Sequence, residues 1–321
     1  MKAVRVVENK IVSDLAKGMV VDGIRLAIRS GGLSEFSNKP GKYLRAVCGD
    51  SSGDILVIDW DFESNWGGES DWDEIKSKKV IEVYGKVDSY EGKLQIIATD
   101  IQIAEDYDKT QFIPKSNKDL QKMYDYLVST VKKVSHRGYR NLLGDFLIEY
   151  KDKIFESVGA KSIHHDYIGG WLEHTYEVLK FVNTACSMYD VDKSLIRTGA
   201  ILHDVGKFLT YDVGASIERN SIDYLVGHIP AGQQIIDRLI GINESFPRDY
   251  SNEDYARLMH IIYNHHDIDS EKAECLTLES AIIRKADALS TIANRIEKIK
   301  SEESSSDVYF DIFTKKQYYL K

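Results

Sequence analysis

The chain has 321 residues, of which 43% are hydrophobic and 10% are aromatic, as in an ordinary soluble globular protein. This length is too great for one small domain and predicts two or three. A formal net charge of −9 argues against a protein that coats duplex nucleic acid through bulk electrostatics, and no apolar run is long enough to span a bilayer.

The first part of the chain, residues 17–105, is predicted to consist mainly of β-strands. Turn residues such as Gly49 and Gly53 separate its apolar stretches, and a short helix is expected at 73–78. Five short strands with one helix before the fourth is the order of an OB-fold barrel. We therefore predict an N-terminal β-barrel domain over residues 1–110, with strands at 20–28, 43–48, 54–60, 80–87 and 94–103.

Aromatic side chains recur along this predicted barrel. On a face that binds single strands, aromatic rings stack on bases and basic side chains contact phosphates, and we predict this role for Tyr84 and Lys86. The alternative for any one aromatic residue is a place in the barrel core or at its rim. The other aromatic candidates are Tyr43, Trp60, Phe62, Trp66 and Tyr90, and Asp59, Asp61 and Glu63 count against strong binding on that stretch.

After a predicted linker at 111–117, which contains Pro114 and Lys115, the pattern becomes helical. Apolar residues recur at helical spacing, as in Leu120, Met123 and Leu127. We predict an all-α helical bundle over 118–300 and a C-terminal tail over 301–321. The main helices of the bundle are expected at 171–188, 193–202, 230–240, 253–263 and 278–299.

The central motif of the helical part is the adjacent pair His203-Asp204, with Lys207 four positions after the histidine. On a helix, His203 and Lys207 would share one face, while Asp204 would project about 100° away from His203. A neutral imidazole and a carboxylate at one buried point can hold a divalent metal, because neither is stable there without a partner. For an isolated pair, a packed histidine beside a capping aspartate is the better interpretation.

The remaining histidines favour the metal interpretation, because eight of the nine lie between His164 and His266. Five separated segments place His or Asp on or at the end of a predicted helix, so their side chains can converge on one interior site. Imidazole and carboxylate donors without cysteine favour Mn²⁺, Fe²⁺ or Mg²⁺ over a closed structural zinc. The donors exceed the need of one tetrahedral ion, which favours two ions sharing one carboxylate. The candidate ligands are His174, His203, Asp204, His228, His265, His266 and Asp287, the last of which is equally well explained as a partner for Arg284.

The order of these histidine and aspartate residues along the chain resembles that of the HD-domain metal-dependent phosphohydrolases. The resemblance is greatest to the YhaM-type 3′-to-5′ exoribonucleases, which place an OB-fold ahead of an HD domain. The resemblance covers residues 15–299, and its most similar stretches are 164–174, 202–207 and 227–229 in the helical part and 83–87 and 90–95 in the barrel. Two departures are expected to lie near the mouth of the site and to affect substrate preference. Asp267 and the glycine-free segment 268–277 follow the paired histidines, and Ser290 stands where an aspartate is common.

The resemblance implies roles for these residues. One ion is assigned to His174, His203, Asp204 and Asp287, and the second to Asp204, His228 and one or both of His265 and His266. Asp204 and Lys207 are the predicted catalytic residues, Lys207 as a contact of the scissile phosphate; a solvated helix-end lysine is the alternative. His164 and His165 are predicted to meet the substrate, or equally to pack beneath the approach to the next helix.

We therefore expect a metal-dependent 3′-to-5′ exonuclease that hydrolyses phosphodiester bonds of single-stranded RNA, and also of DNA, with Mn²⁺ as the favoured metal. The first alternative is a hydrolase of small or cyclic nucleotides, in which the barrel only scaffolds a homo-oligomer. The second alternative is a non-catalytic single-strand binder.

The cysteines bear on the cellular compartment. Cys48, Cys186 and Cys275 are scattered and odd in number, and they form neither a zinc pattern nor a disulfide framework. The N-terminus lacks the apolar core of a signal peptide. Both features predict a cytoplasmic protein with reduced thiols.

Overall fold

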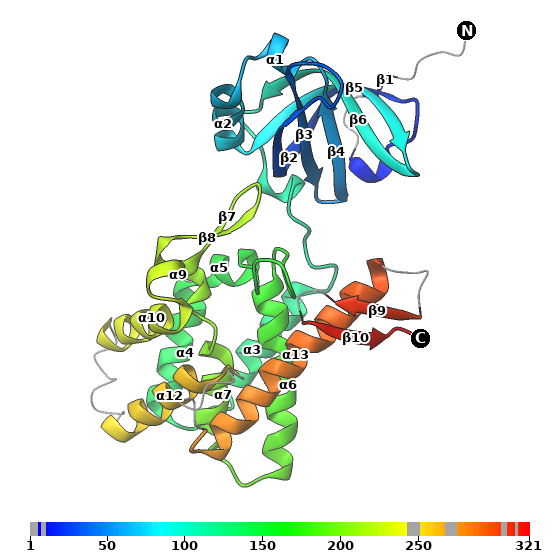
Figure 1. Ribbon diagram of the computed structural model, residues 1–321. Coiled ribbons are helices and arrows are strands. Elements are labelled where there is room, and N and C mark those ends of the chain that lie inside the picture. The colour runs from blue at the N-terminus through cyan, green and yellow to red at the C-terminus, as the bar shows by residue number, and fades with distance from the viewer. Residues whose placement is uncertain (1–5, 8–10, 243–250, 267–274, 303–306, 312–313) are drawn as a thin grey trace. The chain divides into compact units, whose positions relative to one another are not determined.

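The computed structural model describes residues 6–7, 11–242, 251–266, 275–302, 307–311 and 314–321. The chain divides into two compact units (Figure 1). Unit 1 comprises Met1–Pro114 together with Val213–Ser216, and unit 2 comprises Lys115–Asp212 together with Ile217–Lys321. The predicted fold class, a closed five-stranded barrel followed by helices, is confirmed.

Unit 1 is a barrel that closes because its first long strand, β2, pairs with two neighbours. β2 is antiparallel to β3 and to β5, β3 is antiparallel to β4, β4 is parallel to β6, and β6 is antiparallel to β5. Closure leaves these strands without a free edge. The elements of this unit are β1 (Val6–Val7), η1 (Val12–Asp14), β2 (Val20–Glu35), β3 (Lys42–Asp50), β4 (Gly53–Asp59), α1 (Phe62–Asn65), α2 (Glu69–Lys78), β5 (Val80–Tyr90), β6 (Lys93–Ile103) and η2 (Lys109–Gln111).

The predicted end of the first strand at residue 28 is wrong, since β2 continues to Glu35. Beyond residue 28 a glycine allows close packing of β2 on β3. Gly31 has a φ of +120°, and a Cβ at this position would lie 2.4 Å from the carbonyl oxygen of Arg45 on β3. The register shifts between Ile28 and Ser30, which marks a bulge that bends the long strand around the barrel.

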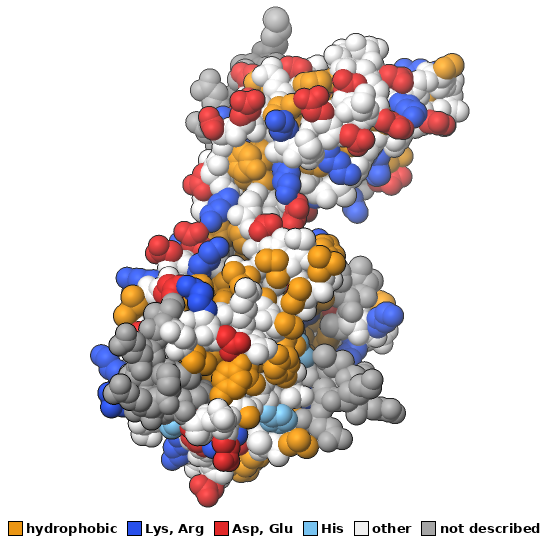
Figure 2. All heavy atoms as spheres, turned by 90° about the vertical axis from the view of Figure 1, so that its left-hand side faces the viewer, with side chains coloured by type: hydrophobic (Ala, Val, Ile, Leu, Met, Phe, Trp, Pro, Cys, Tyr) orange, Lys and Arg blue, Asp and Glu red, His pale blue; other side chains and the backbone are white. Residues whose placement is uncertain are grey.

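The barrel core is apolar, and the burial of each aromatic residue shows whether its side chain lies in this core or at the surface. Phe62 is fully buried and packs edge-on against Trp72 of α2, so it belongs to the core. Trp60 is 41% exposed and lies 4.7 Å, centroid to centroid, from Tyr43. Tyr84 is half-buried and its hydroxyl lies 3.4 Å from Glu82. On the face of unit 1 in Figure 2, acidic and basic side chains are interspersed.

Unit 2 is built around α6, which packs against α3, α7 and α13. Buried Trp171 and Phe146 anchor a core of mostly aliphatic residues. Side-chain caps define several helix starts, for example Asp192, which accepts hydrogen bonds from the backbone at the start of α7. The helices are α3 (Leu120–Val131), α4 (Arg137–Glu149), α5 (Lys151–Glu156), α6 (Gly170–Met188), α7 (Lys193–Leu202), α8 (Lys207–Thr210), α9 (Ser221–Leu225), α10 (His228–Ile242), α12 (Asn252–Asn264) and α13 (Leu278–Glu302).

Two small hairpins were not predicted. The first joins β7 (Tyr211–Val213) to β8 (Ile217–Arg219), and the second, near the C-terminus, joins β9 (Val308–Asp311) to β10 (Lys316–Tyr319). Asp311 accepts two hydrogen bonds from Arg295 of α13, at 2.7 and 3.1 Å, and both side chains are buried. This ion pair holds the second hairpin on α13. Among the residues described, no helix combines the length and apolar character needed to cross a membrane.

Candidate metal centre

The pair His203-Asp204 lies in a turn rather than within a helix. α7 ends just before His203, and α8 begins at Lys207, so the prediction that His203 and Lys207 share one helical face is wrong. The reason is close packing of the turn against α10. A Cβ on Gly206 would lie 1.8 Å from the carbonyl oxygen of His228, so only glycine allows this approach. The turn thereby brings Asp204 next to the first residue of α10.

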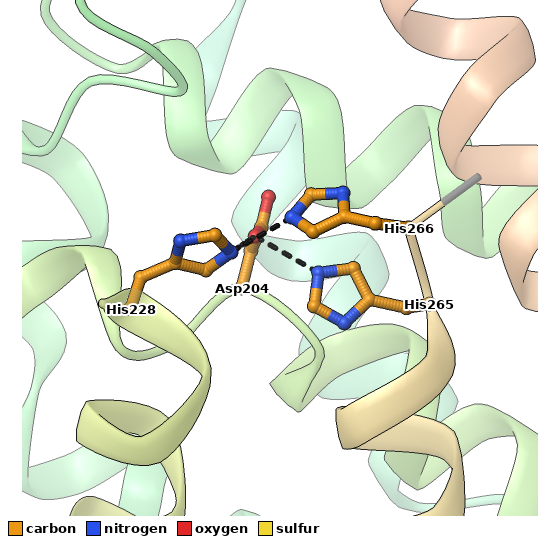
Figure 3. Close-up of side chains that lie close together, drawn as sticks. All are labelled: Asp204, His228, His265 and His266. Atoms are coloured by element: carbon orange, nitrogen blue, oxygen red, sulfur yellow. Dashed lines mark hydrogen bonds and ion pairs between the residues drawn. The ribbon is translucent and has the colours of Figure 1, made fainter. Parts of the chain in front are cut away.

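The carboxylate of Asp204 is fully buried and faces histidines on two sides. Its Oδ2 atom lies 3.5 Å from Nε2 of His174 and 3.5 Å from Nε2 of His203. Its Oδ1 atom lies 3.6 Å from Nε2 of His228 and 3.5 Å from Nε2 of His265. Figure 3 shows the second side, with rings from the start of α10 and the end of α12 directed at the carboxylate. Each carboxylate oxygen of Asp204 therefore faces a different pair of imidazoles.

Asp287 of α13 connects the two sides. Its Oδ1 atom lies 3.2 Å from Nε2 of His174, and its Oδ2 atom lies 3.4 Å from Nδ1 of His266. Within each side two imidazole nitrogens face each other, at 3.2 Å between His174 and His203 and at 2.8 Å between His228 and His266. The structure thus brings all seven candidate ligands together, from the loop after α7 and from α6, α10, α13 and the end of α12.

The charge states of these groups suit metal binding. Burial lowers the pKa of His203 and of His228 to about 3, against the opposing charge of Asp204, so both imidazoles are neutral and have a free lone pair at neutral pH. Burial alone would raise the pKa of Asp204. The charge of Lys207 and the neighbouring imidazoles outweigh burial and hold that pKa well below its usual range, so the carboxylate is ionised.

This donor set fits a divalent cation. Nε2 of His265 and Oδ1 of Asp204 are buried and face each other, yet neither has a hydrogen-bond partner among the described residues. Leaving such atoms unpaired costs about 1–3 kcal/mol each unless another group satisfies them. Two metal–nitrogen bonds of about 2.1 Å at right angles would place their nitrogens about 3 Å apart, close to the 3.2 Å between His174 and His203. A cation on each side of Asp204 would satisfy these atoms.

Lys207 holds Asp204 in place. Its ammonium group donates to Oδ2 of Asp204 at 2.6 Å and to the carbonyl oxygen of Gly159 at 2.6 Å. Burial would lower the pKa of Lys207, but the charge of Asp204 raises it, so the side chain is charged. Trp171 adds a hydrogen bond from its indole Nε1 to the backbone carbonyl of Asp204 at 3.0 Å. An ammonium group has three donors, so one remains beyond these two contacts.

The two histidines at 164 and 165 differ in position. His165 is fully buried, and its backbone N–H donates to Asn294 at 2.7 Å, which favours the packing alternative over contact with substrate. His164 is partly buried and lies 5.9 Å, ring to ring, from His174. Burial, with the charge of Lys207, lowers the pKa of His164 to about 2, so this imidazole is neutral beside the site.

The two departures from the family pattern, at Asp267 with residues 268–277 and at Ser290, have different outcomes. Asp267 and most of the segment 268–277 lie outside the described residues. Ser290 is fully buried and its hydroxyl oxygen lies 2.9 Å from Nδ1 of His174, so its expected place at the mouth of the site is wrong. Its second neighbour, Glu177, was missed. The signal for Glu177 was its position three residues after His174, which puts both side chains on one face of α6.

Comparison with known proteins locates this site within a known family domain. Residues 171–292 match the family model described as HD domain. Over 299 residues the chain is 24% identical to the protein named 3'-5' exoribonuclease YhaM of Listeria monocytogenes serotype 4b (strain CLIP80459), covering 91% of each chain. It is 25% identical over 284 residues to the protein of the same name in Geobacillus sp. (strain WCH70), covering 83% of this chain and 82% of that one.

A third relative with this name, from Oceanobacillus iheyensis, is 23% identical over 279 residues, which are 86% of this chain and 83% of that one. The matches extend well beyond the HD domain and therefore include residues of the barrel. They confirm the resemblance noted from the sequence motifs. Residues 171–292 thus match the HD domain family, and the chain as a whole is similar to the exoribonucleases named YhaM.

Proposed function

We propose that this protein is a metal-dependent 3′-to-5′ exonuclease that hydrolyses phosphodiester bonds of single-stranded RNA. The HD domain and the names of the relatives support a hydrolytic nuclease. The observation that carries the proposal is the position of Asp204, whose two carboxylate oxygens face two separate pairs of imidazoles. A carboxylate placed in this way could be shared by two cations, and two-metal sites are used in phosphodiester hydrolysis.

The ligands fall into two groups in this proposal. His174, His203, Asp204 and Asp287 would hold one cation, and Asp204, His228 and one or both of His265 and His266 would hold the other. Divalent ions at these positions, Mn²⁺ by preference, supply Lewis acidity and lower the pKa of a water molecule toward neutrality. His203 and His228 are neutral and Asp204 is ionised, so these three are ready for this role without losing protons first. Burial alone would lower the pKa of His265, but its contact with the Asp204 carboxylate outweighs burial and raises that pKa, so a cation would compete with a proton at His265.

The other side chains position the substrate and the ligands. Lys207 orients Asp204 and directs its remaining N–H at a phosphate oxygen. His164, neutral and partly buried beside His174, contacts the terminal nucleotide. His228 and His266 have exposed side-chain fractions of 21% and 32%, so the substrate enters from their side. Tyr84 and Lys86 of the barrel bind the strand upstream of the bond that is cut.

A digest of labelled oligonucleotides tests the proposal. With Mn²⁺, a 5′-labelled single-stranded RNA is expected to shorten in single-nucleotide steps, whereas a 3′-labelled strand releases its label in the first step. The same protein is offered single-stranded DNA and a panel of small and cyclic nucleotides. Inert oligonucleotides together with a consumed nucleotide would refute the exonuclease and support the small-nucleotide hydrolase, and strand binding without turnover would support the non-catalytic alternative.

Two variants make this digest specific for the site. Asp204→Asn keeps the size of the side chain and removes the shared charge, so turnover is expected to vanish. His260→Gln is the matched control, since His260 lies on α12 and makes contacts with Asn264 and with the backbone of Leu276, outside the seven candidate ligands. Its turnover is expected to match that of the unaltered protein.

A further inference from the structure

Behind His174, on the side of the ring away from Asp204, a short buried chain of polar groups links α6 to α13. The hydroxyl oxygen of Ser290 lies 2.9 Å from Nδ1 of His174 and 2.7 Å from Oε2 of Glu177. Ser290 and His174 have no exposed surface. The opposite nitrogen of the ring, Nε2, faces His203 and Asp287. The Ser290 hydroxyl is therefore the link between a carboxylate and a candidate metal ligand.

The number of protons fixes the direction of these hydrogen bonds. A serine hydroxyl has one hydrogen, and an ionised carboxylate can only accept, so the hydroxyl donates to Glu177. The hydroxyl oxygen must then accept from Nδ1 of His174, which requires that this nitrogen carries the proton. A neutral imidazole has one N–H, so with the proton on Nδ1 the Nε2 atom would have the lone pair that a metal needs.

Glu177 is held in the ionised form that this argument needs. Burial alone would raise its pKa, but contacts with His165, Ser290 and Lys118 outweigh burial and lower the pKa to about 2. The ammonium group of Lys118 lies 3.3 Å from Oε1 of Glu177, on the other carboxylate oxygen from Ser290. The carboxylate is thus anchored on both oxygens, and its contact with Ser290 is fixed in space.

We propose that Ser290 and Glu177 are positioning residues, which together fix the tautomer and ring orientation of His174 and so set the affinity of the metal site on that side. The inference rests on the proposed metal centre. Histidine ligands of metals commonly donate their second N–H to a carboxylate or carbonyl group. Here a serine hydroxyl stands between the imidazole and the carboxylate, and a glutamate one helical turn from the ligand supplies the charge.

The test removes the hydroxyl and measures the metal site without reference to turnover. Ser290→Ala is compared with Ser280→Ala, a matched control, because Ser280 is also fully buried on α13 but bonds with Thr277 and Cys275. Mn²⁺ affinity is measured by isothermal titration calorimetry and by the electron paramagnetic resonance signal of free Mn²⁺. We expect Ser290→Ala to weaken one of the two sites about 10- to 100-fold, and Ser280→Ala to leave both unchanged.

A second readout reports the tautomer directly. ¹⁵N spectra of metal-free protein labelled at histidine separate protonated from unprotonated ring nitrogens, and the signals of His174 are assigned by their loss in His174→Gln. In the unaltered protein Nδ1 of His174 is expected to carry the proton. In Ser290→Ala the two nitrogens are expected to show mixed occupancy. A general packing defect would lower stability without changing this ratio.

The outcomes separate the inference from the proposed function. Unchanged Mn²⁺ affinity and an unchanged tautomer in Ser290→Ala would overturn the inference and leave the metal centre intact. If the unaltered protein bound no divalent metal, the proposed function would fail, while the tautomer of the metal-free protein would still decide whether Ser290 and Glu177 orient His174. Should Ser290→Ala not fold, Glu177→Leu, which removes the acceptor of the Ser290 hydroxyl, is measured in the same way, with the same expected loss of tautomer preference.

Discussion

The two units differ in how many charged side chains they bury. In unit 1 the described core is apolar, and the described buried polar residues are Asp50, Asp59 and Gln95. Unit 2 buries histidines, carboxylates and a lysine within a few ångströms of one another. Burying charge is costly unless the groups are paired. Unit 2 therefore concentrates paired buried charge at the candidate metal centre, whereas few charged groups are buried in the described part of unit 1.

This difference predicts opposite responses to substitution. A change in the barrel core should alter the free energy of unfolding and leave the metal centre as it is. A change at the metal centre should alter turnover even where the unit stays folded. The predictions below test this contrast, beginning with the largest expected effect.

The largest effect is expected for Asp204→Asn. Loss of the shared carboxylate charge should reduce turnover by roughly 10²–10³-fold or more. The substitution also leaves Lys207 buried without its partner, at 2.6 Å in the unaltered protein, which should destabilise the fold by about 3–5 kcal/mol. Turnover of labelled RNA and urea unfolding measure the two effects.

A double variant separates them. Asp204→Asn with Lys207→Met removes the unpaired ammonium group and should recover most of the lost stability, while turnover stays at the level of Asp204→Asn. Recovery of turnover along with stability would mean that Asp204 acts only by keeping the unit folded, and the contrast between the units would be lost.

The next effect is expected in the barrel. Leu44 of β3 is fully buried in the core of unit 1, so Leu44→Ala should destabilise the barrel by about 2–5 kcal/mol. Mn²⁺ affinity per folded molecule should not change. Leu94→Ala is the control, because Leu94 is 38% exposed and a surface substitution typically costs about 0.5 kcal/mol or less. A fall in Mn²⁺ affinity with Leu44→Ala would contradict the independence of the two units.

Sequence patterns predicted the elements whose signal is local. The 3.6-residue periodicity located α6, α7, α10, α12 and α13 to within a few residues, since each buries one apolar stripe. The convergence of His and Asp candidates followed from their places on those helices. The turn at residues 203–206 and the length of β2 were not predictable, because each depends on a backbone approach at Gly206 or Gly31 that only the folded chain reveals.

The contacts of Ser290 show a second limit of sequence reasoning. As a departure from a family pattern, Ser290 suggested a change at the mouth of the site. Its actual neighbour, Glu177, lies 113 positions away in the sequence, and no local pattern joins the two. Which buried group faces which is decided by the packing of α6 on α13, and side-chain direction there is a property of the assembled unit.

Lowering the pH should reduce the contribution that the ionised Glu177 makes to the stability of the fold. Its folded pKa of about 2 lies below the ordinary value of 4.5, so its ionised form stabilises the fold above about pH 4.5, and this contribution is lost as pH falls toward 2. The contribution is at most about 3 kcal/mol. Glu177→Gln should therefore be less stable than the unaltered protein at pH 6, and the difference should shrink by pH 3.

Unfolding by urea at a series of pH values measures this effect. Glu253→Gln, a substitution at an exposed residue of α12, is the control and should follow the unaltered protein throughout. A constant difference between Glu177→Gln and the unaltered protein from pH 6 to pH 3 would show that Glu177 is not an ionised group held by its neighbours. Buried charge would then contribute less to the difference between the two units.

The smallest effect is expected on the barrel surface, at exposed Lys86 of β5. If Lys86 contacts one phosphate of a single strand, Lys86→Ala should weaken the binding of a long oligonucleotide modestly. It should also reduce the slope of log affinity against log salt by about 0.7. Cleavage of a dinucleotide, whose only internal phosphate is the one that is cut, should not change. If Lys86→Ala weakened the long and the short substrate equally, Lys86 would act at the bond that is cut. If the salt slope did not change, Lys86 would not contact a phosphate of the strand. Because Glu82, Asp88 and Asp100 also lie on β5 and β6, the barrel has little net positive charge to contribute, which is why the expected change is small beside that of Asp204→Asn.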